Sequence, residues 1–358
     1  MALRTHKNDA SLPAVLALIW LCSFNPCLEA APPEVVVHDL FEQDEDTRFQ
    51  ELLREGGTRN ISQPVDGESH RHHPVRLNAR PIVSRFDVAL SKPRRVLIDA
   101  DGSMLVADWG ADVVLKVTST GDVSVFASNL HEPAGLARDA AGNLYVANHA
   151  SGIAGEGSIV KISPGGMPIL FADGLSGPTG LAFDPQGTLF VADFQGDRIV
   201  RISADGDVQP FVDELPTPAA IAFDQHGYLY TVSSTEGTVY RIDPTGNRYI
   251  VFQGLTVPSD LTFDPQGHLI VCNYGGTELT YVDPMGSGRV FATVPKGTIG
   301  LDFDADGNLV FVNWDFQTLM KITMNLQIPC PHCGQTIPLK LRPSQPKRPP
   351  SRTDGPVI

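Results

Sequence analysis

The chain has 358 residues and is 42% hydrophobic, so it is long enough to form one large domain with appendages. Its formal net charge of −14 argues against a nucleic-acid partner, because a protein that binds phosphates needs a basic face. The 33 glycines and 29 prolines indicate a protein rich in turns.

Residues 1–30 have the pattern of a signal peptide. Arg4 and Lys7 give a positive start, and residues 12–24 form an apolar run of 13 residues. This run is short for a membrane span, which needs about 20 apolar residues. A small residue, Ala30, offers a cleavage site. We therefore expect a secreted, periplasmic or cell-envelope protein without a stable membrane span after cleavage; a retained N-terminal anchor is the alternative.

Residues 31–79 read as an acidic leader that is mostly disordered. Positions 34–55 carry eight acidic side chains against two arginines, which favours a solvated segment with at most one short helix. The cluster of His70, His72 and His73 could bind a transition metal, but polar filler in a linker is the favoured interpretation.

A sequence pattern is repeated six times between residues 80 and 325. Each copy has an apolar run, the motif Asp-x-x-Gly, and a second apolar run, and successive copies are 40, 45, 40, 40 and 40 residues apart. The motifs begin at Asp99, Asp139, Asp184, Asp224, Asp264 and Asp304. Strand-length runs at this period predict an all-β, six-bladed β-propeller with four antiparallel strands in each blade. The Asp side chain should accept amides two or three residues on, and the Gly should supply a positive φ.

The outermost strand of each blade carries Phe followed by an aliphatic residue, as at Phe126 and Leu130. The sixth copy lacks this pair, but Phe86 and Leu90 have the same spacing upstream of the first copy. We therefore expect residues 81–90 to supply the outer strand of the last blade and to close the ring. Closure would remove the sheet edges that otherwise recruit other chains.

Residues 142–148 (Gly-Asn-Leu-Tyr-Val-Ala-Asn) and 178–184 (Pro-Thr-Gly-Leu-Ala-Phe-Asp) resemble the NHL-repeat family. They are also similar to its relatives, the regucalcin/gluconolactonase and streptogramin-lyase propellers. The resemblance covers roughly residues 80–324 and implies the propeller fold. It leaves the function open, because this fold hosts binding modules, lactonases and lyases.

Two sets of side chains should converge on the face formed by the loops that enter the inner strands. The first is a polar column of Asp108, Asn148, Asp193, Ser233, Asn273 and Asn313. Caps on the hairpin turns are the favoured interpretation, and ligands of a central Ca²⁺ are the alternative. The second set follows it directly and contains five rings among Trp109, His149, Phe194, Ser234, Tyr274 and Trp314. These rings either pack between blades or form a stacking platform for a sugar or another flat ligand.

Blade two is five residues longer than the others, and the extra length falls in the Gly-rich stretch 150–157. This insertion could be neutral, because surface loops tolerate length well. It could also form a site with nearby His and Glu residues. The candidate ligand-binding residues are therefore Trp109, His131, Glu132, His149, Glu156, Phe194, Tyr274 and Trp314.

Regucalcin-like lactonases hold a divalent metal with a Glu, Asn residues and an Asp near the starts of inner strands. At the corresponding positions of this chain the resemblance finds one acid, Asp260, and neither Glu nor Asn. Asp260 and Asn273 are the candidate metal ligands, with Ca²⁺ as the candidate ion, and no catalytic residue can be assigned. We expect a module that binds a protein or carbohydrate ligand; a metal-dependent hydrolase, lactonase or lyase is the alternative.

The tail, residues 326–358, contains the motif Cys330-Pro-His-Cys333-Gly, which has the spacing of a zinc knuckle. Residues 338–358 contain no second Cys or His pair, so half a zinc site, a vestigial knuckle and a disulfide all remain open. Residues 340–352 are basic and rich in proline, and we expect them to be disordered.

Overall fold

The computed structural model describes residues 34–37, 82–265, 267–283, 286–323, 325–329 and 336–343. The chain divides into two compact units. One comprises Phe41–Met324, and the other combines Met1–Leu40 with Asn325–Ile358. The signal sequence, the histidines of the leader and the Cys330/Cys333 motif lie outside the described residues.

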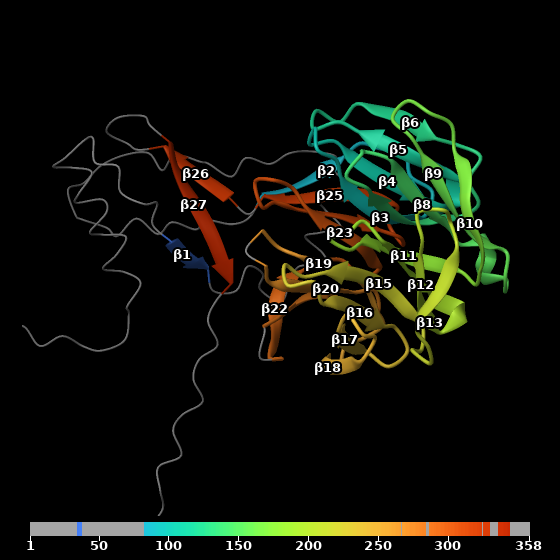
Figure 1. Ribbon diagram of the computed structural model, residues 1–358. Helices are drawn as coiled ribbons and strands as arrows, with labels where there is room; N and C mark the ends of the chain where they lie inside the picture. The colour runs from blue at the N-terminus through green and yellow to red at the C-terminus, as the bar shows by residue number, and fades with distance from the viewer. Residues whose placement is uncertain are drawn as a thin grey trace, which may run out of the picture. The chain divides into compact units, whose positions relative to one another are not determined.

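The larger unit contains six four-stranded antiparallel sheets, which are the blades of a β-propeller. Figure 1 shows β3, β11, β15, β19 and β23 around the middle of the ring, with β6, β10, β18 and β22 at its rim. The all-β, six-bladed fold predicted from the repeats is therefore confirmed.

Each blade has an inner, a second, a third and an outer strand. Blade one consists of β3 (Pro93–Ile98), β4 (Met104–Asp108), β5 (Val113–Val117) and β6 (Val123–Ala127). Blade two consists of β7 (Pro133–Arg138), β8 (Leu144–Asn148), β9 (Gly157–Ile162) and β10 (Ile169–Leu175). Blade three consists of β11 (Pro178–Phe183), β12 (Leu189–Asp193), β13 (Arg198–Ile202) and β14 (Val208–Val212).

Blades four to six repeat this order. Blade four consists of β15 (Pro218–Phe223), β16 (Leu229–Ser233), β17 (Thr238–Ile242) and β18 (Arg248–Gln253). Blade five consists of β19 (Pro258–Phe263), β20 (Leu269–Asn273), β21 (Glu278–Val282) and β22 (Gly288–Thr293). Blade six consists of β23 (Thr298–Phe303), β24 (Leu309–Asn313), β25 (Thr318–Thr323) and β2 (Ile82–Phe86). Short 3-10 turns follow three second strands, at Trp109–Ala111, Ala150–Gly152 and Phe194–Gly196.

The ring is closed by its first strand, as predicted. β2 pairs antiparallel with β25, with Ile82 opposite Thr323 and Phe86 opposite Leu319. Pairing ends at Phe86 rather than at residue 90, but Val88 and Leu90 are buried in the apolar cluster between blades six and one. The N-terminal segment thus completes the last sheet and fills the adjoining interface.

The Asp-x-x-Gly motifs form tight turns between inner and second strands. Asp184 Oδ1 accepts the amides of Gln186 at 2.9 Å and Thr188 at 2.7 Å, and Gly187 has a φ of 84°. The second amide is therefore four residues on, not three as expected. The amide three residues on, that of Gly187, donates to the backbone carbonyl of Asp184 instead of to its side chain.

The described core lies between blades. Each of its six apolar clusters combines side chains from two neighbouring blades, and no blade encloses a cluster alone in this part of the chain. The last residue of the inner strand commonly supplies a ring that meets an aromatic side chain of the preceding blade edge-on. Such pairs are Tyr145–Phe183, Phe190–Phe223 and Tyr230–Phe263, with ring centroids 5.0, 5.2 and 5.3 Å apart. The blades therefore stabilise one another, and closure protects them all.

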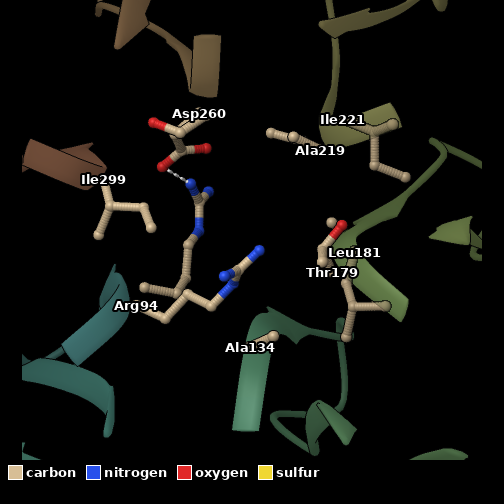
Figure 2. Close-up of a pocket in the computed structure, with 12 residues that line it drawn as sticks. Arg94, Ala134, Thr179, Leu181, Ala219, Ile221, Asp260 and Ile299 are labelled. Atoms are coloured by element: carbon tan, nitrogen blue, oxygen red, sulfur yellow. Dashed lines mark hydrogen bonds and ion pairs between the residues drawn. The ribbon is translucent and has the colours of Figure 1, made fainter. Parts of the chain in front are cut away.

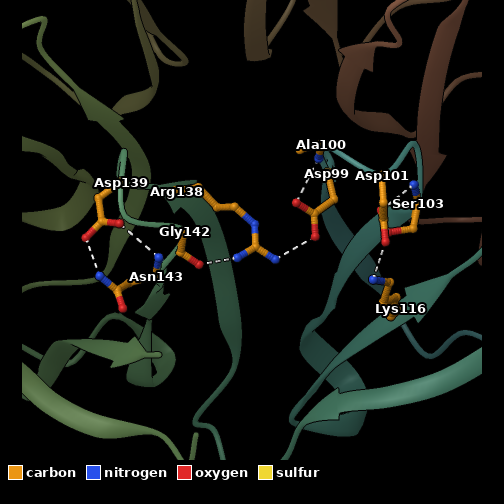
Figure 3. Close-up of polar contacts among 9 residues, drawn as sticks. All are labelled: Asp99, Ala100, Asp101, Ser103, Lys116, Arg138, Asp139, Gly142 and Asn143. Atoms are coloured by element: carbon orange, nitrogen blue, oxygen red, sulfur yellow. Dashed lines mark hydrogen bonds and ion pairs between the residues drawn. The ribbon is translucent and has the colours of Figure 1, made fainter. Parts of the chain in front are cut away.

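The interface of blades one and two departs from this aromatic pattern. Arg138 takes the position of the phenylalanine, and its two terminal nitrogens donate to Asp99 Oδ2 and to the Gly142 carbonyl, each at 2.6 Å (Figure 3). Its Cζ also lies 5.7 Å from the centroid of the Phe126 ring. An ion pair thus joins these two blades where rings join others.

The second unit contains a three-stranded sheet made from both ends of the chain. β27 (Thr336–Pro343) pairs in parallel with β1 (Glu34–Val37) and antiparallel with β26 (Asn325–Pro329). Residues 34–37 of the leader and residues 340–343 of the basic stretch lie in strands of this sheet. Apolar residues alternate through Ile337, Leu339 and Leu341, which is the period of a strand. The part of the chain that the structure describes contains no helix long and apolar enough to cross a membrane.

Candidate functional site

The loops that enter the inner strands and the loops after the second strands share one side of the ring, here called the loop face. The Gly110 amide donates to the Ser91 carbonyl at 2.7 Å, and the Trp314 amide donates to the Gly297 carbonyl at 2.9 Å. Each of these hydrogen bonds joins the loop that enters an inner strand to the loop that follows the second strand of the same blade.

Polar side chains at the ends of second strands fasten these loops. Asp108 Oδ2 accepts the Ser91 amide at 2.8 Å, Asn148 Oδ1 accepts the His131 amide at 3.2 Å, and Asp193 Oδ1 accepts the Ser176 amide at 2.5 Å. The partner lies 17 residues earlier in each case. Much of the polar column therefore holds the incoming loop of its own blade, in addition to the hairpin caps that we expected.

Caps of the expected kind occur later in the column. Asn313 Oδ1 accepts the Phe316 amide at 2.8 Å, and Ser233 Oγ accepts the Glu236 amide at 3.3 Å. Asp108 is buried, and this burial raises its pKa to about 6 against the opposing effect of the Ser91 and Gly110 amides.

The inner strands surround a central cavity of about 20 Å³, room for about one water molecule. Every inner strand shows a register shift within its first four residues. A bulge places two residues opposite one and can turn consecutive side chains to the same side. This explains why the neighbouring residues Arg94 and Arg95 both line the cavity, together with Ala134, Thr179 and Asp260 (Figure 2).

Close approach of the inner strands restricts one position of each bulge. A side chain at Gly135 would collide with the Thr179 carbonyl oxygen, and one at Gly300 would collide with the Arg94 carbonyl oxygen. In blades one and five the same position is occupied by Arg95 and Asp260 instead. The two large charged side chains therefore share a space that other blades leave to glycine or alanine.

Asp260 accepts hydrogen bonds from three donors. Its carboxylate binds the Arg95 guanidinium across the cavity, and it accepts the amides of Leu261 at 2.9 Å and Leu301 at 2.8 Å. Burial raises the pKa of Asp260, and Arg95 acts in the opposite direction. This arrangement connects blades one, five and six.

The candidate metal ligands are engaged within the protein. Asp260 has Arg95 as its cation, and Asn273 Nδ2 donates to the Glu278 carbonyl at 2.9 Å and to Thr280 Oγ1 at 3.0 Å. Among the residues that the structure describes, no group of three or more His, Cys, Asp and Glu side chains could hold a metal ion.

Arg94 contrasts with its neighbour. Its guanidinium has no hydrogen-bond acceptor in the described ranges, and its Cζ lies 5.0 Å from the centroid of the Trp109 ring. Burial lowers the pKa of Arg94 to about 10, while Asp260, Tyr274 and Glu132 oppose this shift. Arg94 therefore still carries its charge at neutral pH.

Three rings from blades one, two and six meet beside Arg94. The Trp109 centroid lies 4.4 Å from that of His149 and 5.9 Å from that of Trp314, the latter pair being edge-on. Lys92 Nζ lies 5.5 Å from the Trp314 centroid. We call Arg94, Trp109, His149 and Trp314 the mouth cluster, because they lie where the cavity opens to the loop face.

His149 is a neutral member of this cluster. It is 6% exposed, and its Nδ1 has no hydrogen-bond partner. Burial, followed by the charge of Arg94, lowers its pKa to about 3. Glu132 Oε2 is 3.9 Å from Nδ1, and the Glu132 carboxylate instead accepts the amide and the hydroxyl of Ser151.

The other predicted ligand-binding residues lie apart from the mouth cluster or at its edge. Tyr274 Oη donates to Asp315 at 3.3 Å, and Phe194 packs against the core of blades four and five. His131 and Glu156 are exposed. The structure thus brings together Trp109, His149 and Trp314, places Glu132 beside them, and gives Phe194 a packing role.

Sequence reasoning missed Arg94 and Lys92. Both stand beside Pro93 at the start of an inner strand, where the repeat offers a recognisable signal. The proline identifies the residues after it as facing the centre of the ring. It does not indicate which of the two neighbouring arginines, Arg94 or Arg95, lacks a hydrogen-bond acceptor.

Two larger grooves lie on the opposite side, among the Asp-x-x-Gly turns. They have volumes of about 480 Å³ between blades three and four and about 510 Å³ between blades four and five. Their acids include turn residues such as Asp224, whose Oδ1 accepts the amides of His226 and Tyr228. The mouth cluster is the stronger candidate because it contains a cation and a buried imidazole nitrogen without hydrogen-bond partners.

No protein-family model and no curated protein matches this sequence. Solved structures do match. A gluconolactonase from Xanthomonas campestris is 18% identical, with a TM-score of 0.59 over 68% of this chain and 90% of that one. Virginiamycin B lyase from Staphylococcus aureus is 16% identical, with a TM-score of 0.52 over 75% and 89%. An auxiliary nutrient binding protein from Bacteroides thetaiotaomicron is 13% identical, with a TM-score of 0.58 over 65% and 69%. At these identities the likeness establishes the propeller fold alone.

Proposed function

We propose that this protein is a secreted or cell-envelope binding module that takes a carbohydrate ligand at the mouth cluster. The observation that carries the proposal is the meeting of Trp109, His149 and Trp314 beside the Arg94 guanidinium, which has no hydrogen-bond acceptor among the described residues. Aromatic faces offer a large contact area to a sugar ring at low entropic cost, and polar groups among them can bind its hydroxyls. A protein ligand, the other class that the sequence leaves open, is an outcome of the test below.

The nutrient-binding propellers among the structural neighbours support a binding function, although their likeness is one of fold. Export is supported by the signal-like pattern of residues 1–30. Detection of the mature N-terminus in the medium or periplasm would test this part of the proposal, and retention of the whole protein in the cytoplasm would contradict it.

A lactonase and a lyase are among the structural neighbours, so a metal-dependent hydrolase or lyase is the alternative function. That alternative places a metal at Asp260, yet the Asp260 carboxylate already has the Arg95 guanidinium and two amides as donors. No geometric feature of the described residues specifically favours hydrolysis, so we assign binding as the function.

Binding can be tested with a glycan array followed by calorimetry on the full chain. Trp109→Ala and Trp314→Ala should each weaken saccharide binding at least tenfold, as expected for loss of a stacked ring. Trp314→Ala should also lower the melting temperature, because Trp314 packs against the core cluster of blades six and one. Ile153→Ala is the matched control, because Ile153 is a 50% exposed apolar residue on a loop of the same face and lies outside the mouth cluster.

Three results would decide against the proposal. These are binding that survives both Trp substitutions, binding of a protein partner with no saccharide competing, or turnover of a lactone that Asp260→Asn abolishes. The last result would revive the metal-dependent hydrolase.

A further inference from the structure

The mouth cluster contains a positive charge that the fold does not neutralise. Arg95 points its guanidinium to Asp260, and Asp260 also accepts two backbone amides. Glu132 accepts two hydrogen bonds from Ser151. Neither nearby acid forms a hydrogen bond with Arg94.

A partly buried cation without an acceptor is costly, because the protein has removed some of its water without supplying hydrogen bonds in return. Such a group is retained at little net cost when a ligand supplies the missing acceptors. The planar guanidinium fork matches the two oxygens of a carboxylate and can donate to both.

The surroundings of Arg94 select among anions. His149 is neutral at physiological pH, since its pKa is lowered to about 3, and it adds no charge to bind a dianion. Lys92, the other cation near the rings, is exposed to solvent, where its charge is screened. The chain as a whole has a net charge of −14, which repels densely charged polyanions. A group with a single negative charge fits these conditions best.

The remaining contacts suit a sugar ring that bears this group. Trp109 lies against Arg94 and next to His149 and Trp314, so a carboxylate on Arg94 would place its ring beside aromatic faces. One buried polar atom of the mouth cluster, His149 Nδ1, has no hydrogen-bond partner among the described residues. An imidazole nitrogen of this kind can bind a hydroxyl group.

We propose that the ligand is an acidic saccharide in which the carboxylate of a uronic acid residue binds the guanidinium of Arg94. This inference rests on the proposed carbohydrate-binding function and adds the chemical class of the ligand. Arg94 sets specificity for the acid, while Trp109 and Trp314 supply affinity for the sugar ring.

The test compares uronic-acid disaccharides with neutral counterparts in which the carboxylate is replaced by CH₂OH. We expect calorimetry with the full chain to show about tenfold to a hundredfold tighter binding of the acid, the range expected for hydrogen bonds between charged groups. Raising the salt concentration should weaken binding of the acid and leave the neutral sugar nearly unchanged.

Arg94→Gln should abolish the preference for the acid and preserve the weaker affinity for the neutral sugar. Arg94→Lys should restore part of the preference, because it keeps the charge and loses the fork. Melting temperatures close to that of the parent would show that the variants are folded, as expected for a side chain with no hydrogen-bond acceptor among the described residues.

Each failure has a distinct meaning. Equal binding of acidic and neutral sugars, with dependence on Trp109, would overturn the assignment of Arg94 and leave the proposed function standing. Preference for sulfated over uronic saccharides would overturn the carboxylate assignment. Absence of binding to any saccharide would overturn both this inference and the proposed function.

Discussion

Arg95 binds the Asp260 carboxylate inside the central cavity, whereas Arg94, one residue closer to the loop face, lies among rings and has no hydrogen-bond acceptor among the described residues. The two side chains share a strand, a charge and a bulge that turns both toward the middle of the ring. They differ in their contact with Asp260, which forms an ion pair with Arg95 and no hydrogen bond with Arg94. The two neighbouring arginines therefore differ in whether the fold supplies an acidic hydrogen-bond partner, and this difference is the basis of the binding site proposed at Arg94.

The largest effect is expected at the internal pair. Asp260→Ala should lower the free energy of unfolding by about 3–5 kcal/mol, because it leaves Arg95 buried without its counter-charge and two amides without an acceptor. Urea unfolding measures this loss. A double variant, Arg95→Met with Asp260→Leu, should recover much of it; a loss below about 1 kcal/mol in the single variant would show that the pair does not stabilise the ring.

A direct contrast of the two arginines should follow. Arg95→Gln is expected to destabilise the protein by about 2–4 kcal/mol, and Arg94→Gln by about 0.5–1 kcal/mol, because the latter loses the contact with the Trp109 ring but breaks no hydrogen bond. The two substitutions are chemically identical and adjacent, so each is the control for the other. Similar losses of stability in both variants would mean that Arg94 has a structural role, and would contradict the distinction drawn between Arg94 and Arg95.

Arg138 offers an intermediate case at the interface of blades one and two. Arg138→Ala should cost about 1–2 kcal/mol, since it removes a partly buried ion pair with Asp99 and a bond to the Gly142 carbonyl. Arg138→Lys should recover some of the loss, because an ammonium can keep one of the two contacts. Thermal unfolding of the three proteins would check this order, and equal stabilities would contradict it.

The smallest effect concerns the acid that fastens the first loop. The folded pKa of Asp108, about 6, lies above its ordinary value of 3.8, so the folded state holds this proton more tightly. Its contribution to stability is therefore present at low pH and is lost as pH rises from about 4 through about 6.

Asp108→Asn should remove that pH dependence and raise the melting temperature by a few degrees at pH 7. The amide can still accept the Ser91 N–H, as Asn148 does from His131 in blade two. Melting curves between pH 4 and pH 8 provide the measurement. A variant that is less stable than the parent at pH 7 would show that the carboxylate charge strengthens the loop contact.

The architecture could be predicted from the sequence because the same pattern of turns and strands occurs in six copies. The pairing of β2 with β25 was also predictable, since the Phe86/Leu90 spacing is missing from the last copy. Positional equivalence was a weaker guide to the site. Phe194 occupies the same repeat position as Trp109, yet it packs against the core of blades four and five, whereas the Trp109 ring lies beside Arg94 and His149.

The role of Arg94 could not be read from the sequence for a different reason. Whether a charge is free depends on which acids reach it through space, and Asp260 is 165 residues from its partner Arg95 along the chain. Sequence spacing carries no information about that choice. The bulge that turns both arginines inward is likewise a property of the paired strands.

Closure by the N-terminal strand has a consequence for synthesis. β2 leaves the ribosome before any other part of the ring, but its partner β25 follows after the five intervening blades and most of its own. Chain entropy makes this wait inexpensive, because closing a loop six times longer than one blade costs only about 1.6 kcal/mol more. During the wait, however, β2 is an unpaired strand, and β25 presents an unpaired edge from its own synthesis until β2 joins it. The seam at β2 is therefore where a nascent chain is most exposed to joining a second copy of itself.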